Sequence, residues 1–344
     1  MTRIVGVDVA RGLAVLGMMT AHVGPEPPDP GLPHGLRALA DGRPSALFVV
    51  LAGLSLALLS GGSQPATGRL MLRARVRIAV RGVLVLILGV WLAALGTPVV
   101  VILPTYAVLF LVGILVLSWP TSALVFGAAA LAVLTPPLRA AVTGGDPSSV
   151  EGQWLAELLV GPYYPALVWA AYLLAGLALG RCDLRSARIR WRVCWLGAVL
   201  AVVGYGGAWA AQRVGAVADA LGGLASSEPH SSTTFEVAGN TGVALVVIAA
   251  CLAAADAWPR AVAPVAAVGA LALTAYTVHL VVIWQLGPGV VYDASAGGWL
   301  AFLLVTIAAC WAWRTWLGRG PLERVLHGVS TTIADRAVRV PVAG

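Results

Sequence analysis

The sequence predicts an all-α, polytopic integral membrane protein with about ten transmembrane helices and with both termini in the cytoplasm. Of the 344 residues, 59% are hydrophobic and only 11% are charged, whereas soluble proteins carry about 25% charged residues. The chain also divides into about ten mainly apolar segments, each close to the roughly 20 residues that a spanning helix needs. These two observations define the fold class, and the placement of the arginines defines the orientation.

The arginines gather in two short segments between apolar stretches. Five lie within residues 69–81 and five within residues 181–192. Because basic loops resist translocation, both segments are predicted to face the cytoplasm. With this orientation 17 of the 22 arginines lie on the inner side, and nine of the fifteen acidic residues lie in outer loops. The two distributions agree on one topology.

The individual spans follow from the apolar runs and from the polar segments between them. In chain order the predicted spans are 4–23, 44–60, 82–97, 102–119, 121–137, 163–180, 193–212, 234–256, 262–285 and 297–316. Arg3 precedes the first run as in a signal peptide, but no A-x-A site follows, so this run is interpreted as an uncleaved first helix. Outer loops 138–162 and 213–233 are long enough to fold over a site.

The chain has one predicted membrane domain and a short tail. Residues 1–318 form the domain and residues 319–344 the cytoplasmic C-terminal tail, with an amphipathic piece on the inner face followed by a disordered end. The expected location is a bacterial cytoplasmic membrane, where the protein is multi-pass. A homodimer is compatible with the sequence, which gives no oligomeric state.

Several function classes find no support. A net charge of +7 is compatible with nucleic-acid binding, but the basic residues flank spans, where topology and anionic lipid head groups explain them. The four cysteines have no metal-ligand spacing, and no HxxxH or HExxH pattern occurs, so no metal site is predicted. No GxSxG elbow, P-loop or GxGxxG is present, which leaves hydrolase, NTPase and dinucleotide-binding functions without a motif.

Charged residues inside the first span are functional candidates, because charges are costly in a bilayer. Asp8 and Arg11 stand at i and i+3, so they can neutralise each other on one helix face. One interpretation is a structural ion pair that positions the helix. The other is that Arg11, in the inner half of the membrane, binds an anionic group such as a phosphate that enters from the cytoplasm.

Four of the five histidines are predicted on the outer side, at His22, His34, His230 and His279. Each one alone is more often structural, and a common depth does not show that the rings meet. Histidine is nevertheless the side chain best suited to remove a proton near neutral pH.

Glu236 lies at the outer end of the eighth span, where it could orient a histidine ring. Asn240 and the hydroxyl residues around it could bind a hydroxyl-rich ligand, or the hydroxyl residues could only cap the helix.

Several segments resemble one family, in order along nearly the whole chain. They are Arg3-Ile-Val-Gly-Val-Asp8-Val-Ala-Arg11-Gly12, Gly42-Arg43-Pro-Ser-Ala-Leu-Phe48, Gly161-Pro-Tyr-Tyr-Pro165, His230-Ser-Ser-Thr-Thr-Phe-Glu236, Leu273-Thr-Ala-Tyr276-Thr-Val-His279 and Gly320-Pro-Leu-Glu323. The chain resembles the transmembrane acyltransferases, which include bacterial relatives of heparan-α-glucosaminide N-acetyltransferase, the YeiB-like membrane proteins and, more distantly, the type-3 acyltransferases.

This resemblance implies an O- or N-acyltransferase that moves an acetyl or other acyl group from cytoplasmic acyl-CoA to an extracytoplasmic sugar or lipid-linked glycan. It implies a catalytic histidine near the junction of the first two spans. His22 matches the histidine that ends the first helix of the type-3 enzymes, whereas His34 lies nearer the position of the active histidine in the heparan enzyme. His22 is preferred because its helix orders it.

The resulting candidate site has three parts. The catalytic candidates are His22, His34, His279 and Glu236, those for binding acyl-CoA are Arg11, Asp8 and Arg43, and those for binding the acceptor are His230, Asn240 and Tyr276. The expected partners are acyl-CoA, the acceptor and membrane lipids, without nucleic acid. The alternative function is a transporter or permease in which Asp8, Arg11 and His279 line a pathway, and a third is a membrane binding partner without catalysis.

Overall fold

The part of the chain that a computed structural model describes, residues 4–25 and 40–338, contains helices and connecting turns but no strand. Its long helices overlap the predicted apolar ranges. They are α1 (Val5–Val23), α3 (Arg43–Leu59), α4 (Gly68–Ala93), α5 (Leu103–Val116), α6 (Thr121–Val142), α8 (Ala166–Gly180), α9 (Ala187–Ala201) continued by η2 (Val202–Gly206) and α10 (Gly207–Arg213), α12 (Thr234–Ala257), α13 (Ala263–Ala270) with α14 (Ala272–Leu286), and α16 (Ala296–Trp316). Helices α4 and α9 begin earlier than predicted, so the arginine-rich segment 69–81 is helical and is not the loop that the sequence predicted.

Among the described helices, five are long and apolar enough to cross a bilayer: α4, α6, the rod from α9 to α10, α12 and α16. A sixth span results if the bent pair α13 and α14 is counted as one. Helices α3, α5 and α8 are apolar but shorter. The protein is therefore an all-helical, polytopic membrane protein. Ten spans and cytoplasmic termini remain predictions.

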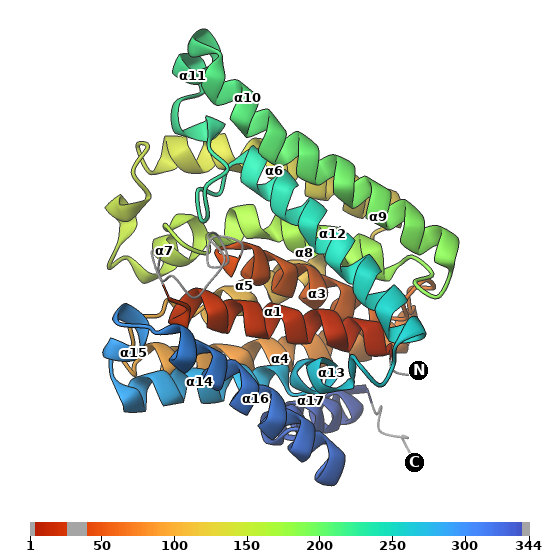
Figure 1. Ribbon diagram of the computed structural model, residues 1–344. Coiled ribbons are helices and arrows are strands. Elements are labelled where there is room, and N and C mark those ends of the chain that lie inside the picture. Colours follow the sequence, from red (N-terminus) through yellow and green to blue (C-terminus); the bar gives the residue numbers. More distant parts are fainter. Residues whose placement is uncertain (1–3, 26–39, 339–344) are drawn as a thin grey trace.

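Short helices occupy the segments that connect the long ones. They are η1 (Pro147–Val150), α7 (Trp154–Val160), α11 (Gly215–Leu221), η3 (Gly222–Ala225) and α15 (Gly289–Tyr292). The two outer loops predicted to be long enough to cover a site thus hold η1 with α7 and α11 with η3. In Figure 1 the rod from α9 to α10 extends past the other helices and carries α11 at its tip.

Helix α1 lies in the middle of the bundle, between α12 and α3 on one side and α13 and α16 on the other (Figure 1). Most of its residues are buried, including the polar Asp8. A helix that is buried on several faces must be apolar nearly all round, and α1 meets this condition except at the few polar positions described below.

Glycines allow the helices to approach closely. A Cβ atom added to Gly12 of α1 would meet the carbonyl of Val265 in α13, and one added to Gly269 of α13 would meet the carbonyl of Asp8. Gly53 and Gly176 have the same role between α3 and α8. Small residues at contacts are how helices pack in lipid, where the hydrophobic effect does not drive them together. The contact with α13 fixes the part of α1 that carries Asp8 and Arg11.

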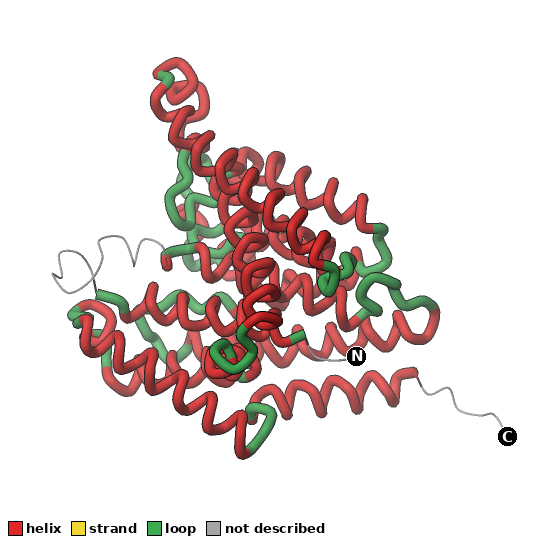
Figure 2. Tube along the Cα trace, turned by 45° about the vertical axis from the view of Figure 1, so that its right-hand side comes forward, coloured by secondary structure: helices red, strands yellow, loops and turns green. Residues whose placement is uncertain are grey.

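The bundle has two chemically different ends. The first, here called the basic end, holds the start of α1, both arginine-rich segments and helix α17 (Pro321–Val338). The second, here called the histidine end, holds the last turn of α1 and the first turns of α3, α8 and α12. Figures 1 and 2 show that the chain begins and finishes its described part at the basic end.

Helix α17 corresponds to the amphipathic piece predicted in the tail, and it packs along the arginine-rich half of α4. The Nε atom of Arg73 lies 2.5 Å from the carboxylate of Asp335, and the Nε of Arg81 donates to Ser330 at 3.3 Å. The tail is therefore held against the membrane domain by polar contacts to α4.

Candidate active site

Two histidines meet at the histidine end. His22 ends α1 and His279 lies in α14, and the Nδ1 of His22 is 3.0 Å from the Nε2 of His279. The rings are stacked, with centroids 5.3 Å apart and planes 14° from parallel. His279 is buried and His22 is half-buried. A hydrogen bond between two imidazole nitrogens needs one donor and one acceptor, so the tautomer of one ring fixes that of the other.

Neighbouring side chains hold this histidine pair in place. The ring of Tyr276, one turn before His279 on α14, meets the edge of the His279 ring at 5.1 Å between centroids. On α1, Thr20 accepts a hydrogen bond of 3.1 Å from the indole nitrogen of Trp299 in α16. Three helices thus determine where the two rings lie.

Glu236 is the centre of a second polar group at the same end. Its carboxylate accepts hydrogen bonds from the backbone of His230 at 2.9 Å and of Ser232 at 2.5 Å, and from the side chains of Ser231 and Asn240 at 3.2 Å each. His230 and Ser232 have positive φ angles of 62° and 53°, which is unusual for residues other than glycine. Glu236 therefore stabilises a strained loop, and it contacts the backbone of His230 rather than its ring.

Asn240 connects Glu236 to Arg43 through Tyr205. The hydroxyl of Tyr205 donates to the Asn240 side chain at 2.6 Å and accepts from the Nε of Arg43 at 3.0 Å. The Arg43 guanidinium also lies 4.9 Å from the centre of the Tyr205 ring. Tyr205 stands in η2, a five-residue π-helical segment, and such segments often mark functional sites.

The ring of His230 contacts residues outside the Glu236 loop. Its Nδ1 is 3.2 Å from the carbonyl oxygen of Tyr163, and its Nε2 is 3.6 Å from the carboxylate of Asp41. Burial lowers the pKa of His230, but the contact with Asp41 and the charge of Glu236 outweigh it, so the pKa is raised above the usual value. The edges of the Tyr163 and Tyr164 rings complete the surroundings.

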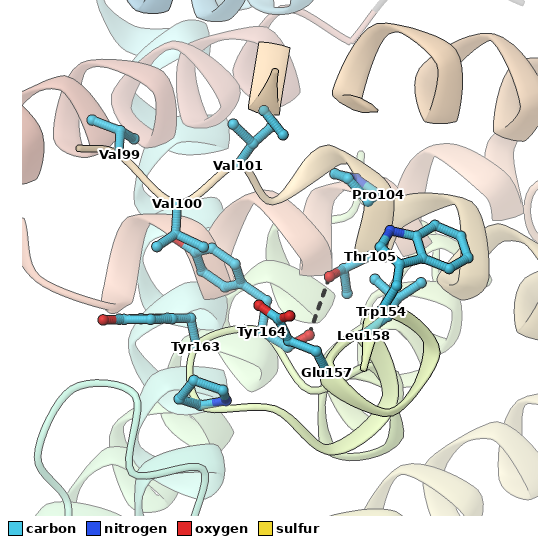
Figure 3. Close-up of a pocket in the computed structure, with 12 residues that line it drawn as sticks. Val99, Val100, Val101, Pro104, Thr105, Trp154, Glu157, Leu158, Tyr163 and Tyr164 are labelled. Carbon is cyan, nitrogen blue, oxygen red and sulfur yellow. Dashed lines mark hydrogen bonds between the residues drawn. The ribbon is translucent and has the colours of Figure 1, made fainter. Parts of the chain in front are cut away.

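A pocket of about 270 Å³ opens beside these tyrosines (Figure 3). Its lining comes from the segment before α5 with the first turn of α5, and from α7 with the loop that follows. It includes Thr105, Trp154, Glu157 and Tyr164. The hydroxyl of Thr105 donates to the carbonyl of Tyr164 at 3.2 Å, as Figure 3 shows.

Arg139 organises this end, although it lies in the predicted outer loop 138–162 and is not among the predicted site residues. Its buried guanidinium donates to the carbonyls of Val160 at 3.0 Å, Gly161 at 2.9 Å and Ser231 at 3.2 Å. It thereby joins the loop that carries Tyr163 and Tyr164 to the loop that carries His230. A signal was present in the sequence, because Arg139 stands two residues after Pro137, at the end of a long apolar run.

At the basic end, Arg11 has three partners on three elements. Its guanidinium donates to Asp8 at 3.0 Å, to Ser55 of α3 at 3.0 Å and to the carbonyl of Gly269 in α13 at 3.4 Å. The Arg11 side chain keeps 24% of its surface exposed. These bonds use Nη1 and Nη2, and a guanidinium has five N–H donors.

Asp8 and Arg11 border a second pocket, of about 390 Å³. The rest of its lining comes from the end of α3, the Gly61–Gly62 turn and the segment after α8, including Arg185. Arg181 holds this lining together, because it donates to the Gly62 carbonyl at 2.8 Å and to the Leu117 carbonyl at 2.6 Å.

The predicted site residues thus form three groups. His22, His279 and Tyr276 are together, Glu236, Asn240, His230 and Arg43 are together, and Asp8 and Arg11 are together. Arg43 lies at the opposite end from Arg11, so the three residues predicted to bind acyl-CoA do not meet. His34 lies outside the described residues. Within those residues, no three His, Cys, Asp or Glu side chains cluster as a metal site would require.

Comparison with known families agrees with this architecture. The family model described as "Heparan-alpha-glucosaminide N-acetyltransferase, catalytic" matches residues 3–210, and the model described as "Protein of unknown function (DUF418)" matches residues 181–332. No curated protein matches the chain. The fold and these matches define a membrane acyltransferase-like protein. The chain belongs to the heparan-α-glucosaminide N-acetyltransferase-like, YeiB-like family, and the predicted resemblance is confirmed.

Proposed function

We propose that the protein takes an acyl group from acyl-CoA, bound at the basic end, and transfers it to an acceptor at the histidine end. The donor is acetyl-CoA or another acyl-CoA, and the acceptor is an extracytoplasmic sugar or lipid-linked glycan. One observation carries the proposal: helix α1 borders the Arg11 pocket near one end and at the other end carries His22, which pairs with His279. Arg11 and His22 are about 16 Å apart along the helix, from the rise per residue.

The basic end is suited to the phosphates of the donor. Arg11 retains exposed surface and unused N–H groups beside a pocket, and guanidinium binds phosphate with directed, charge-assisted bonds. In the pocket lining itself, Arg11 and Arg185 are balanced by Asp8 and Asp183. The surplus of positive charge comes from the surrounding arginine-rich segments, which raise the local concentration of anions. In the predicted topology this end faces the cytoplasm, where acyl-CoA is made.

The histidine pair supplies a base with a fixed orientation. His22 removes the proton of the acceptor hydroxyl or amine, and the acceptor oxygen or nitrogen forms a bond to the thioester carbonyl carbon. The carbon–sulfur bond then breaks, and the CoA thiolate takes the proton from the His22 imidazolium. His279 accepts the Nδ1–H of His22, as the orienting partner does in a base–orienter pair.

The pocket beside Tyr163 and Tyr164 is the proposed acceptor site. It combines aromatic rings with the carboxylate of Glu157, a mixture of apolar and polar groups typical of small-molecule sites. His230 borders it through the two tyrosines, and Asn240 supports the His230 loop through Glu236. Tyr276 links this side to the catalytic pair, because it contacts His279 and its hydroxyl lies against the backbone of Ile102.

The direct test uses purified protein in detergent with radiolabelled acetyl-CoA and, as a matched probe, acetylpantetheine, which lacks the nucleotide phosphates. We expect binding and slow hydrolysis of acetyl-CoA, and clearly weaker binding of acetylpantetheine. A protein that neither binds nor hydrolyses acetyl-CoA would contradict the proposal. The permease alternative predicts that the protein neither binds nor hydrolyses acetyl-CoA. The match to a catalytic family does not favour this alternative.

A further inference from the structure

The helix that carries His279 begins at a sharp break. Helices α13 and α14 are separated by one residue, Leu271, and their axes differ by 80°. Helix α13 is fixed to α1 through the glycine contact at Gly269. A break of this size means that α13 does not determine the direction of α14, so another contact must orient it.

The start of α14 lacks a capping side chain of its own. Its N-cap residue is Leu271, which makes no side-chain hydrogen bond to the helix. The first backbone N–H groups of a helix have no partner within it. Inside a membrane protein such groups must be satisfied by protein atoms, since the hydrocarbon offers none.

Glu323 of α17 supplies the missing cap from 50 residues further along the chain. One carboxylate oxygen accepts from the backbone N–H of Leu273 at 2.8 Å and of Thr274 at 3.1 Å. The other oxygen accepts from the hydroxyl of Thr274 at 2.6 Å. The negative charge also complements the positive end of the helix dipole. All three of these hydrogen bonds are made to the first turn of α14.

The surroundings of this contact are built around it. The backbone N–H of Leu322 donates to the Thr274 hydroxyl at 3.3 Å. Gly320 is buried, and a Cβ atom there would collide with the Glu323 carboxylate and lie 2.9 Å from the Thr274 hydroxyl oxygen. The lack of a side chain at Gly320 therefore leaves the space in which the Glu323 carboxylate reaches the start of α14.

We propose that Glu323 is a positioning residue, which sets the direction and rotation of α14 and thereby holds the His279 ring against His22. His279 lies five residues after Thr274 on the same continuous helix, so a change in the first turn is transmitted to its ring. The relevance to catalysis rests on the proposed function, but the positioning itself does not. Helix α17 would thus connect the basic end of the bundle to the histidine pair.

The test measures the exposure of His279 directly. Full-length protein in detergent is treated with diethyl pyrocarbonate, and the modification rate of each histidine is followed by mass spectrometry. His279 is only 2% exposed and should react slowly. In Glu323→Ala its rate should rise on the order of tenfold, because charge-assisted bonds of this strength are lost. Glu323→Gln, which keeps an acceptor, should restore most of the protection, and Thr274→Val should raise the rate less than Glu323→Ala does.

Asp335→Asn is the matched control, because it removes a different contact of α17 and leaves the start of α14 intact. The His279 rate should not change in this variant. If the two variants expose His279 equally, or if a folded Glu323→Ala protein keeps His279 protected, the proposal is wrong. Should Glu323→Ala not fold, the same test is made with the remaining variants. The proposal predicts that His279 is modified faster in Thr274→Val than in Asp335→Asn, and equal rates would contradict it.

Acyl transfer provides a second readout. In Glu323→Ala the rate at saturating donor should fall while the affinity for acetyl-CoA stays unchanged, and Glu323→Gln should recover part of the rate. A parallel loss of donor affinity would contradict positioning of His279. If the wild-type protein transfers no acyl group, the proposed function fails, and the modification rates still test the role of Glu323.

Discussion

The two ends of α1 use charged and polar groups in different ways. At the histidine end, the carboxylate of Glu236 accepts hydrogen bonds from four donors. Tyr205 is bonded to both Arg43 and Asn240, and Asn240 is bonded to both Tyr205 and Glu236. At the basic end, Arg11 makes three bonds but stays partly exposed beside a pocket. The histidine end is therefore held in one arrangement, as a catalytic geometry requires, whereas the basic end keeps bonding capacity for a ligand.

The same contrast separates two roles of arginine. Arg139 and Arg181 are buried, and the partners in their described bonds are mainly backbone carbonyls, so they hold loops in place. Arg11 is exposed to a pocket and is paired with a carboxylate. Charge alone does not distinguish these roles; burial and the kind of acceptor do. The following predictions test the distinction, starting with the largest expected effect.

Loss of the base should have the largest effect. His22→Ala should lower acyl transfer by roughly 10²–10⁴-fold, the usual contribution of general acid–base catalysis, while the affinity for acetyl-CoA stays nearly constant. His279→Ala should reduce the rate less, and His34→Ala less again. Steady-state rates and equilibrium binding of radiolabelled donor separate the two quantities. Full activity in His22→Ala with an inactive His34→Ala would move the base to position 34.

Loss of the basic-end cation should affect binding instead. Arg11→Ala should weaken acetyl-CoA binding by about 10- to 100-fold, because a charge-assisted bond to phosphate contributes about 1.5–3 kcal/mol. The rate at saturation should change little. The substitution also removes the partner of Asp8, so it is compared with Arg11→Ala combined with Asp8→Asn. Unchanged donor affinity in a folded protein would assign the ion pair a structural role.

Loss of a buried organising arginine should affect stability. Arg139→Met leaves the carbonyls of Val160, Gly161 and Ser231 without their donor, which should cost about 1–3 kcal/mol of folding free energy. The melting temperature of the purified protein should fall accordingly, with donor affinity preserved in the remaining folded fraction. Arg181→Met is the matched variant at the other end. We expect Arg181→Met to lower the melting temperature too, but to weaken acetyl-CoA binding, which Arg139→Met should not do. Equal donor affinities in the two variants would contradict the proposed difference between the ends.

The smallest expected effect concerns pH. Because the pKa of His230 is raised in the folded protein, its protonated ring stabilises the fold most at pH values below its unfolded pKa of about 6.5. This contribution is lost as the pH rises through the folded pKa. The melting temperature of wild type should therefore exceed that of His230→Gln more at pH 5.5 than at pH 8.5. An equal difference at both pH values would contradict the role assigned to the contact with Asp41.

The apolar runs of the sequence placed the long helices approximately, because such runs report on the bilayer. The arginine segments were predicted as loops, but the first one is helical, since α4 begins at Gly68. The sequence also paired Asp8 with Arg11, since i and i+3 on one helix are neighbours whatever the tertiary structure. It gave a common depth for His22 and His279 but could not show that they meet, since depth does not specify which way a helix faces. Arg43 was grouped with Arg11, although the predicted topology itself put it on the other side.

Two further features had no adequate signal in the sequence. The break at Leu271 lies inside the apolar run 262–285, and its proline, Pro264, is seven residues away from the break, so a single span was predicted. The cap that Glu323 provides depends on two segments 50 residues apart, and no local pattern reports such a contact. Both features depend on tertiary packing, which overrides local propensity.

The central claim is that the donor binds at the basic end and the acceptor at the histidine end. It is tested most directly by the side of the membrane from which the donor binds. Sealed vesicles are prepared in both orientations, and the exposed face is identified with an impermeant thiol reagent in cysteine-free protein carrying Ser186→Cys or Ser149→Cys. Radiolabelled acetyl-CoA, which does not cross the bilayer, is then added outside. We predict binding to vesicles that expose position 186, at the basic end, and none to vesicles that expose only position 149. Binding at the face of position 149 would contradict the account.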